Sequence, residues 1–261
     1  MEEWITSGQN PKIKNLLVLQ EKSRARREQG LFVVEGRREL RHCLEGGFKI
    51  DTLFFCDEIA GQAGKMPDLI GHLVHIPRTL YEKISYRGST EGLIAEVRVR
   101  ERTLSDLVLP DHPLIVVLEG VEKPGNIGAV LRSADAAGAD ALLVCDPLTD
   151  LWNPNLIRAS LGGIFTVPTV ACTSEEAITF LQERGIAILT AQLQDSELYY
   201  DTPMTGGTAL VMGTEATGLT DPWRKAATRH IRIPMNGRLD SLNVSVSAAI
   251  LLYEAVRQRS L

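Results

Sequence analysis

Four small polar residues stand at the start of the last predicted helix of the chain. The segment DSLNVSVSAAILLYEA covers residues 240–255, and its apolar residues recur at helical spacing from Val244 onward. Serine and asparagine compete with helical hydrogen bonds and cost stability inside a helix. An N-cap at Ser241 accounts for one of the four. We expect the others to face a binding site rather than the core, and they are Asn243, Ser245 and Ser247.

Two further segments combine glycine with polar side chains directly after a predicted strand. In EGVEKPGNIGAVLRSADAAGAD, a glycine turn leads into a helix that places Asn126 near its start and Arg132 six residues later. An arginine beside such a turn suits the binding of an anion such as phosphate. In LVMGTEATGL, a strand ends at Gly213 and Glu215 follows, and glycine there lets a ligand approach the backbone. Each segment alone also fits an ordinary turn, but together the three predict one shared pocket.

The elements that would position these loops alternate between strand and helix. PLIVVLEGV is a continuous apolar run, typical of a strand buried on both faces of a parallel sheet, and ALLVCD, AILTAQ, TALVMG and HIRIPM are further strand candidates. The predicted fold class is α/β, with a mostly parallel sheet, flanking helices and a ligand beyond the carboxyl ends of the strands. The linker ERTLSDLVLPDHP separates this domain, residues 106–261, from a smaller α/β domain, residues 1–105.

Composition narrows the class of protein. The 261 residues carry a formal net charge of −5, yet PKIKNLLVLQEKSRARREQG is locally basic, which suits either phosphate contact or an ordinary solvated helix face. MEEWITSGQN lacks the features of a signal peptide and no apolar run approaches a membrane span, so we expect a cytoplasmic protein. The four cysteines and five histidines show no metal-ligand spacing, and we expect neither a metal nor a disulfide.

Three segments, in their order along the chain, resemble the motifs of a known enzyme family. PGNIGAVLRSADAAG, LVMGTEATGL and IPMNGRLDSLNVSVSAAILLYEA look like those of the SpoU/TrmH family of RNA ribose 2′-O-methyltransferases, within the SPOUT class. NPNLIRASLGGIFTVP resembles the family's segment between the first two motifs, so the match runs from about Leu114 to the end of the chain. The first domain, with FVVEGRRELRHCLEGG, is similar to the small RNA substrate-binding domain often fused upstream.

The resemblance has implications for the fold, the cofactor and the site. It implies a deep trefoil knot in the C-terminal domain, S-adenosylmethionine as cofactor and a homodimer. It also implies cofactor contacts, largely through the main chain, at Gly213, Ile233, Met235, Leu242, Thr190, Ala191 and Gln192. The residues that match catalytic or substrate-proximal positions of the family are Asn126, Arg132, Glu215, Ser241 and Asn243.

The expected reaction is methyl transfer to a ribose 2′-hydroxyl of structured RNA. Arg132 is expected to bind the phosphate beside the target ribose and to polarise the hydroxyl. The family's proposals make this arginine a general base, which would require a costly deprotonation of the guanidinium. The separate first domain favours rRNA over tRNA as the substrate. Candidate RNA contacts are Arg24, Arg26, Arg27, Arg37 and Arg158, and for Arg158 a structural ion pair is an alternative.

Other classes of function compete with this one. A non-catalytic RNA-binding protein that keeps the fold is the main alternative, although it need not retain Asn126, Arg132, Glu215 and Asn243 together. A nucleotide-binding oxidoreductase would need the fingerprint G-x-G-x-x-G, which the turn at G-N-I-G lacks. A protein methyltransferase is disfavoured by the basic region near the N-terminus.

Overall fold

The computed structural model describes residues 2–61, 70–86, 91–214 and 217–260. Contacts divide the chain into two compact units, which are Met1–Arg100 with Asp150–Thr166 and Glu101–Thr149 with Val167–Leu261. The chain therefore leaves the first unit, returns to it once and leaves it again. The predicted division after residue 105 differs from these units, because it assigns the segment 150–166 to the second domain.

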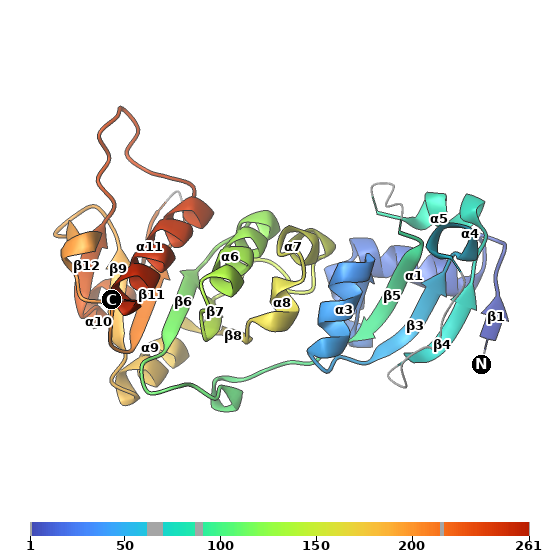
Figure 1. Ribbon diagram of the computed structural model, residues 1–261, viewed down its shortest axis with the longest axis horizontal. Coiled ribbons are helices and arrows are strands. Elements are labelled where there is room, and N and C mark those ends of the chain that lie inside the picture. Colours follow the sequence, from blue (N-terminus) through green and yellow to red (C-terminus); the bar gives the residue numbers. More distant parts are fainter. Residues whose placement is uncertain (1, 62–69, 87–90, 215–216, 261) are drawn as a thin grey trace. The chain divides into compact units, whose positions relative to one another are not determined.

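The first unit contains a five-stranded mixed sheet in the order β1-β4-β3-β5-β2 (Figure 1). Strands β1, β4 and β3 run parallel, whereas β5 is antiparallel to both of its neighbours. Its elements are β1 (Glu2–Trp4), α1 (Pro11–Glu21), α2 (Ser23–Gln29), β2 (Leu31–Glu35), α3 (Arg37–Glu45), β3 (Ile50–Phe55), α4 (Asp57–Ala60), β4 (Ile70–His75), α5 (Arg78–Ile84), β5 (Leu93–Arg98), α7 (Pro154–Ala159) and α8 (Gly163–Thr166).

Local sequence explains where the first helix begins. The side-chain oxygen of Asn10 accepts a hydrogen bond of 2.9 Å from the backbone N–H of Lys12, and Pro11 occupies the first helical position. This N-cap satisfies a donor that the helix itself leaves unpaired, and proline has no donor to lose there. The predicted start of this helix, at Asn10 and Pro11, is confirmed.

Aromatic side chains anchor the returning segment 150–166 within the first unit. The ring of Trp152 stacks on Phe32, with centroids 4.4 Å apart and planes inclined by 20°. Phe165 meets Phe48 edge-on, with a centroid separation of 5.3 Å. Stacked and edge-to-face pairs bury large apolar surfaces in defined geometry, so this segment belongs to the core of the unit.

The second unit is built on a seven-stranded sheet in the order β10-β12-β9-β11-β6-β7-β8, and all neighbouring strands run parallel (Figure 1). Its elements are the 3-10 helix η1 (Leu104–Asp106), β6 (Leu114–Glu119), α6 (Pro124–Ala136), β7 (Ala141–Cys145), β8 (Thr169–Cys172), α9 (Ser174–Glu183), β9 (Ala187–Ala191), β10 (Glu197–Leu198), the 3-10 helix η2 (Tyr199–Asp201), β11 (Thr208–Met212), α10 (Asp221–Ala226), β12 (Arg229–Arg232) and α11 (Val244–Arg259).

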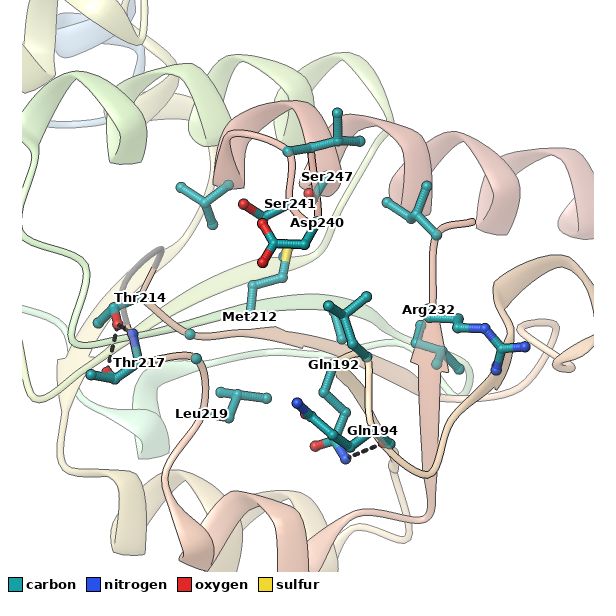
Figure 2. A pocket seen from close by; sticks show the side chains of 18 of the residues that line it. Gln192, Gln194, Met212, Thr214, Thr217, Leu219, Arg232, Asp240, Ser241 and Ser247 are labelled. Carbon is teal, nitrogen blue, oxygen red and sulfur yellow. Dashed lines mark hydrogen bonds between the residues drawn. The ribbon is translucent and has the colours of Figure 1, made fainter. Parts of the chain in front are cut away.

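Helices cover both faces of this sheet. Helices α6 and α11 pack against each other on one face, and α9 and α10 lie on the other (Figures 1 and 2). Every residue of β6 is buried, and its alternate residues Ile115 and Val117 join Phe180 and Trp223 in the core beneath α9 and α10. The prediction of an α/β fold with a mostly parallel sheet is confirmed. No helix in the described part of the chain is long and apolar enough to cross a membrane.

A buried carboxyl group in the first unit makes stability depend on pH. Glu96 on β5 is 5% exposed, and burial raises the pKa of its carboxyl group to about 7. A hydrogen bond of 3.3 Å from the Asn15 amide opposes this shift in pKa only in part. Because the folded pKa lies above the unfolded value, the folded state favours the protonated carboxyl.

We expect Glu96→Gln to relieve this dependence. The stability that protonated Glu96 provides is fully present below its unfolded pKa and is lost as the pH rises through the folded pKa of about 7. The variant should therefore gain in free energy of unfolding relative to the wild type between pH 4.5 and pH 8, by about 3 kcal/mol at most. Urea unfolding across this pH range measures the gain. The exposed Glu21→Gln is the control, and equal pH profiles for wild type and Glu96→Gln would contradict the prediction.

Candidate functional site

A cavity of about 340 Å³ opens at the carboxyl ends of β9, β11 and β12. Its walls are the end of β9 and the chain that follows it (191–194), the described parts of the loop after β11 (212–214 and 217–219), residues around the end of β12 (231–233 and 235), and residues before and in the first turn of α11 (240–242, 244 and 247). In Figure 2, Asp240 and Ser241 lie on the α11 side, and Gln192 and Leu219 lie on the opposite side. Of the three loops predicted to share one pocket, the second and third do so, at the edge of the sheet that the parallel fold predicts, whereas no residue of the first loop lines this cavity.

The loop after β11 is held in a tight conformation. A Cβ atom on Gly213 would lie 2.3 Å from the carbonyl carbon and oxygen of Gly218 and 2.6 Å from the backbone nitrogen of Leu219. Thr214 and Gly218 form an isolated antiparallel bridge, and the hydroxyls of Thr214 and Thr217 lie 2.8 Å apart (Figure 2). The backbone returns so closely on itself that only glycine fits at position 213.

The polar start of α11 has a different cap from the predicted one. Asn243, not Ser241, is the N-cap: its Oδ1 accepts 3.0 Å from the backbone N–H of Ser245 and 2.6 Å from the Ser245 hydroxyl. The prediction of Ser241 as cap is wrong because the helix begins later, at Val244. Of the three residues expected to face a site, Ser247 lines the cavity, whereas Asn243 and Ser245 do not. Ser241, the expected cap, lines the cavity instead.

A hydrogen bond between two amides joins the first predicted loop to the third. Nδ2 of Asn243 donates to Oδ1 of Asn126 over 3.2 Å, across a separation of 117 residues in sequence. Asn126 lies in the first turn of α6, as predicted, and α6 packs against α11. The Oδ1 atom of Asn243 caps its own helix while its Nδ2 holds the neighbouring one, which explains why an amide stands at this position.

Two other residues predicted to be catalytic are not among the described residues that line the cavity, for different reasons. Arg132 is exposed on α6 and does not line the cavity; six residues along a helix place it about 9 Å beyond Asn126 along the axis. Glu215 lies outside the residues that the structure describes.

The structure brings together most of the predicted cofactor positions. Six of the seven line the cavity, which are Ala191, Gln192, Gly213, Ile233, Met235 and Leu242. Thr190 does not, because it is fully buried within β9, where its hydroxyl lies 2.7 Å from Nδ1 of His230.

The sequence analysis did not identify several polar residues of the cavity. Arg224 on α10, Arg232 at the end of β12 and Asp240 before α11 are the charged lining residues among those described. Their types carry no pattern that distinguishes them from other surface charges. Thr214 and Thr217 also line the cavity, and their place between the two glycines of LVMGTEATGL would have marked them as candidates.

The predicted RNA-contacting arginines divide into exposed and enclosed side chains. Arg24, Arg27 and Arg37 are exposed, and Arg24 forms an ion pair of 2.6 Å with Glu28 on the same helix. Arg158 is half-buried, donates 2.8 Å to the carbonyl of Tyr86 and lies over its ring with 5.3 Å to the centroid. These two contacts give Arg158 a structural role. The alternative prediction was a structural ion pair, but the partner is the carbonyl and ring of Tyr86 rather than an acidic side chain.

The prediction that Arg26 contacts RNA is wrong for this structure. Its side chain is 2% exposed, and its Nε lies 2.6 Å from Oδ2 of Asp150. Its Nη1 also donates to the carbonyls of Leu19 and Gln20, at 2.6 and 3.2 Å. The guanidinium therefore holds the returning segment and the end of α1 instead of facing solvent.

The cysteines are all free thiols. Burial raises the pKa of Cys43 to about 12, which keeps it protonated and unreactive. The Sγ atoms of Cys145 and Cys172 lie 3.9 Å apart on neighbouring strands. Within the described ranges, no group of three or more His, Cys, Asp or Glu side chains is arranged to hold a metal ion.

A cavity at the carboxyl ends of a parallel sheet, walled by a glycine-bearing loop and a polar helix start, is typical of a small-molecule-binding site in an α/β protein. The model of the SpoU rRNA Methylase family matches residues 113–253, and the chain belongs to this family. Residues 10–95 match the model of the MRM3-like substrate binding domain.

Relatives of known activity extend this assignment. The chain is 39% identical over 176 residues to the 23S rRNA (guanosine-2′-O-)-methyltransferase RlmB of Escherichia coli (strain K12), which covers 65% of this chain and 72% of that protein. The crystal structure of an RNA 2′-O ribose methyltransferase matches with a TM-score of 0.84 at 39% identity, over 99% of this chain and 100% of that one. The AdoMet-bound rRNA methyltransferase of Sinorhizobium meliloti matches with a TM-score of 0.90 at 28% identity, over 98% of each chain.

The geometry of Arg26 predicts a large loss of stability in Arg26→Ala. Removing the guanidinium leaves the enclosed Asp150 carboxylate without its cation, which costs about 3–5 kcal/mol in free energy of unfolding. The matched variant Arg24→Ala removes an exposed ion pair and should cost about 1 kcal/mol or less. Urea unfolding of both variants makes the comparison. Similar stabilities for the two variants would mean that Arg26 is not the structural arginine described here.

Proposed function

We propose that the chain is an S-adenosylmethionine-dependent methyltransferase that transfers a methyl group to a ribose 2′-hydroxyl of rRNA. The observation that carries the proposal is the shared cavity of the second and third motifs, which the Asn243–Asn126 hydrogen bond joins to the first motif. Membership of the SpoU rRNA methylase family and the relationship to a 23S rRNA methyltransferase support the reaction and favour rRNA over tRNA.

The cavity fits the proposed cofactor. Its volume of about 340 Å³ is in the range of small-molecule sites, and it combines the apolar side chains of Ile233 and Leu242 with the backbone of Gly213. An adenine ring suits apolar walls and backbone hydrogen-bonding groups, while the methionine portion needs polar partners. Among the described side chains, Arg224 and Asp240 offer charges for a carboxylate and an ammonium group.

The chemistry requires alignment and charge stabilisation. When bound, S-adenosylmethionine supplies a methyl group already activated by its sulfonium. The protein must hold the ribose oxygen in line with that methyl and stabilise negative charge as the hydroxyl proton leaves. In this proposal Arg132 binds the phosphate next to the ribose, and Asn126, Ser241 and Asn243 orient the sugar. Glu215 keeps the role that the family resemblance implies for it, at a position outside the described residues.

The two parts of the chain take separate roles. The second unit carries methyl transfer, and the first unit, which includes the segment 150–166, selects the RNA; the match of residues 10–95 to a substrate-binding domain supports this division. Arg24, Arg27 and Arg37, all exposed, are the proposed phosphate contacts. We also propose the family's trefoil knot and homodimer for the second domain, a cytoplasmic location, and catalysis without a metal.

Mapping of ribose methylation tests the proposal most directly. Total RNA from cells with and without the gene should differ in at least one 2′-O-methyl group of rRNA. A loss confined to tRNA would change the substrate class. Identical maps would favour the alternative of an RNA-binding protein without activity.

Gly213→Ala tests the cofactor site. Its new Cβ would meet the backbone of Gly218 at 2.3 Å, so the loop must move and S-adenosylmethionine affinity should fall at least about tenfold. Gly237→Ala, in the third loop, is the matched control because no atom lies within 4 Å of its Cβ, and it should bind as the wild type does. Isothermal titration calorimetry measures both. Unchanged affinity in Gly213→Ala would remove this loop from the cofactor site.

Arg132→Ala separates catalysis from cofactor binding. Loss of a cation that stabilises the developing charge should lower the rate of methyl transfer about 100-fold or more, while S-adenosylmethionine affinity stays within about twofold because Arg132 does not line the cavity. Arg132→Lys keeps the charge without the planar fork, so its rate should lie between the two. Transfer of labelled methyl groups to rRNA measures the rates. Full activity in Arg132→Ala would refute the role assigned to this residue.

A further inference from the structure

A carboxylate lies at the buried carboxyl end of β6, beside the cavity loop rather than within the cavity. Glu119 is the last residue of the strand and is 4% exposed. Side chains alternate between the two faces of a strand, so Glu119 points to the same face as Ile115 and Val117, toward α9 and α10. In the sheet it pairs with Cys145 of β7. Burial of an ionised carboxylate is costly unless strong donors compensate for the lost water, so its partners are informative.

Both oxygens of Glu119 bind the same residue of the cavity loop. The backbone N–H of Thr220 donates to Oε2 over 2.9 Å, and the Thr220 hydroxyl donates to Oε1 over 2.5 Å. Thr220 follows directly on Gly218 and Leu219, which line the cavity, and it is the N-cap residue of α10. The carboxylate thus fixes the end of the loop to a central strand, 101 residues away in sequence.

A second group of contacts fixes the helix that follows. The Ser174 hydroxyl lies 2.6 Å from Oδ2 of Asp146 and 3.2 Å from Oε1 of Glu119, and it accepts 2.9 Å from the indole N–H of Trp223. The hydroxyl has one proton, and the shorter distance assigns it to Asp146. Trp223 is fully buried on α10. Helix α10 is therefore held at its cap by Glu119 and one turn later by Ser174.

The fixed elements carry the wall of the cavity. Leu219 is 3% exposed and anchors the loop in the apolar core, and Arg224 lines the cavity from α10. The bridge between Thr214 and Gly218 and the contact between the Thr214 and Thr217 hydroxyls connect the loop only to itself. The bonds from Glu119 connect it to the sheet.

We propose that Glu119 is a positioning residue for the cofactor cavity: it sets the loop 217–219 and Arg224 in the conformation that binds S-adenosylmethionine. The identity of the ligand in this inference rests on the proposed function. The positioning of the loop by Glu119 does not. Glu119 acts through Thr220, and it touches neither the cavity nor the reacting atoms.

Because both carboxylate oxygens of Glu119 accept hydrogen bonds from Thr220, a conservative and a disruptive substitution of Glu119 should differ in their effects. Glu119→Gln keeps an oxygen for the Thr220 N–H and presents an amide NH₂ to the Thr220 and Ser174 hydroxyls, which can accept it. Glu119→Ala leaves the Thr220 N–H and hydroxyl without their acceptor. The milder Thr220→Val removes the hydroxyl and keeps the backbone donor.

Asp140→Ala is the matched control for a loss of stability alone. Asp140 Oδ2 accepts 2.7 Å from the backbone N–H of Leu114, at the opposite end of the same strand β6. This variant removes a carboxylate that binds a backbone donor of the same unit, but at the edge of the sheet away from the cavity.

Calorimetric titration with S-adenosylmethionine, at a temperature where every variant is folded, is the first measurement. We expect the dissociation constant to rise at least about tenfold in Glu119→Ala and about fourfold in Thr220→Val, and to stay within about twofold in Glu119→Gln and Asp140→Ala. Wild-type affinity in Glu119→Ala would overturn the inference. So would an equal loss of affinity in Asp140→Ala, because it would reduce the role of Glu119 to general stability.

Amide hydrogen exchange is the second measurement and needs no ligand. Glu119→Ala should accelerate exchange in residues 217–226 and leave β6 and β11 as in the wild type, while Asp140→Ala should leave residues 217–226 unchanged. Uniform acceleration, or none, would overturn the inference. If the wild type itself fails to bind S-adenosylmethionine while exchange in 217–226 responds as expected, the proposed function fails and the positioning of the loop by Glu119 stands.

Discussion

Strands β12, β9 and β11 lie side by side and run parallel, so the chain that follows each of them emerges at the same edge of the sheet. This constraint brings together segments that are far apart in sequence. The glycine loop, the chain after β9 and the approach to α11 meet there and enclose one cavity. Side chains contribute specificity at this edge, but strand direction creates the place where they can act.

The polar start of α11 has two tasks that an apolar residue could not perform. Asn243 uses its oxygen to cap α11 and its nitrogen to hold Asn126 of α6. Ser245 adds a second donor to the same oxygen, which fixes the orientation of the amide. A helix start that would be destabilising in an ordinary core is stabilised here because its polar groups bind one another and the neighbouring helix.

Much of the fold could be predicted because its signals are local and repeated. Continuous apolar runs identified the central strands, and Asn10 with Pro11 marked the start of α1. These features depend on neighbouring residues, and a sequence displays neighbours directly. The glycine at position 213 was predicted to let a ligand approach the backbone, but the space beside it is filled by the backbone of Gly218 and Leu219.

The remaining features depend on distant partners. Arg24 and Arg26 look alike in a basic run, yet one is exposed and the other is enclosed by Asp150, which comes much later in the chain. Ser241 and Asn243 are both residue types that cap helices well. The one that caps α11 is Asn243, which also donates a hydrogen bond to the distant Asn126. Arg224 and Arg232 reach the cavity only because of the fold. The charge of a residue and its tendency to cap a helix can be predicted from sequence. Whether its side chain is buried, and which distant residue it contacts, cannot.

The returning segment 150–166 has a consequence for dividing the molecule. Phe32 and Phe48 of the first unit pack on Trp152 and Phe165, which the chain supplies only after it has begun the parallel sheet. A fragment that stopped near residue 105 would expose these rings to water and would tend to aggregate. The first unit therefore completes its apolar interior late during synthesis, after β6 and β7 have left the ribosome, and neither unit is an autonomous module that can be moved between proteins by a single cut.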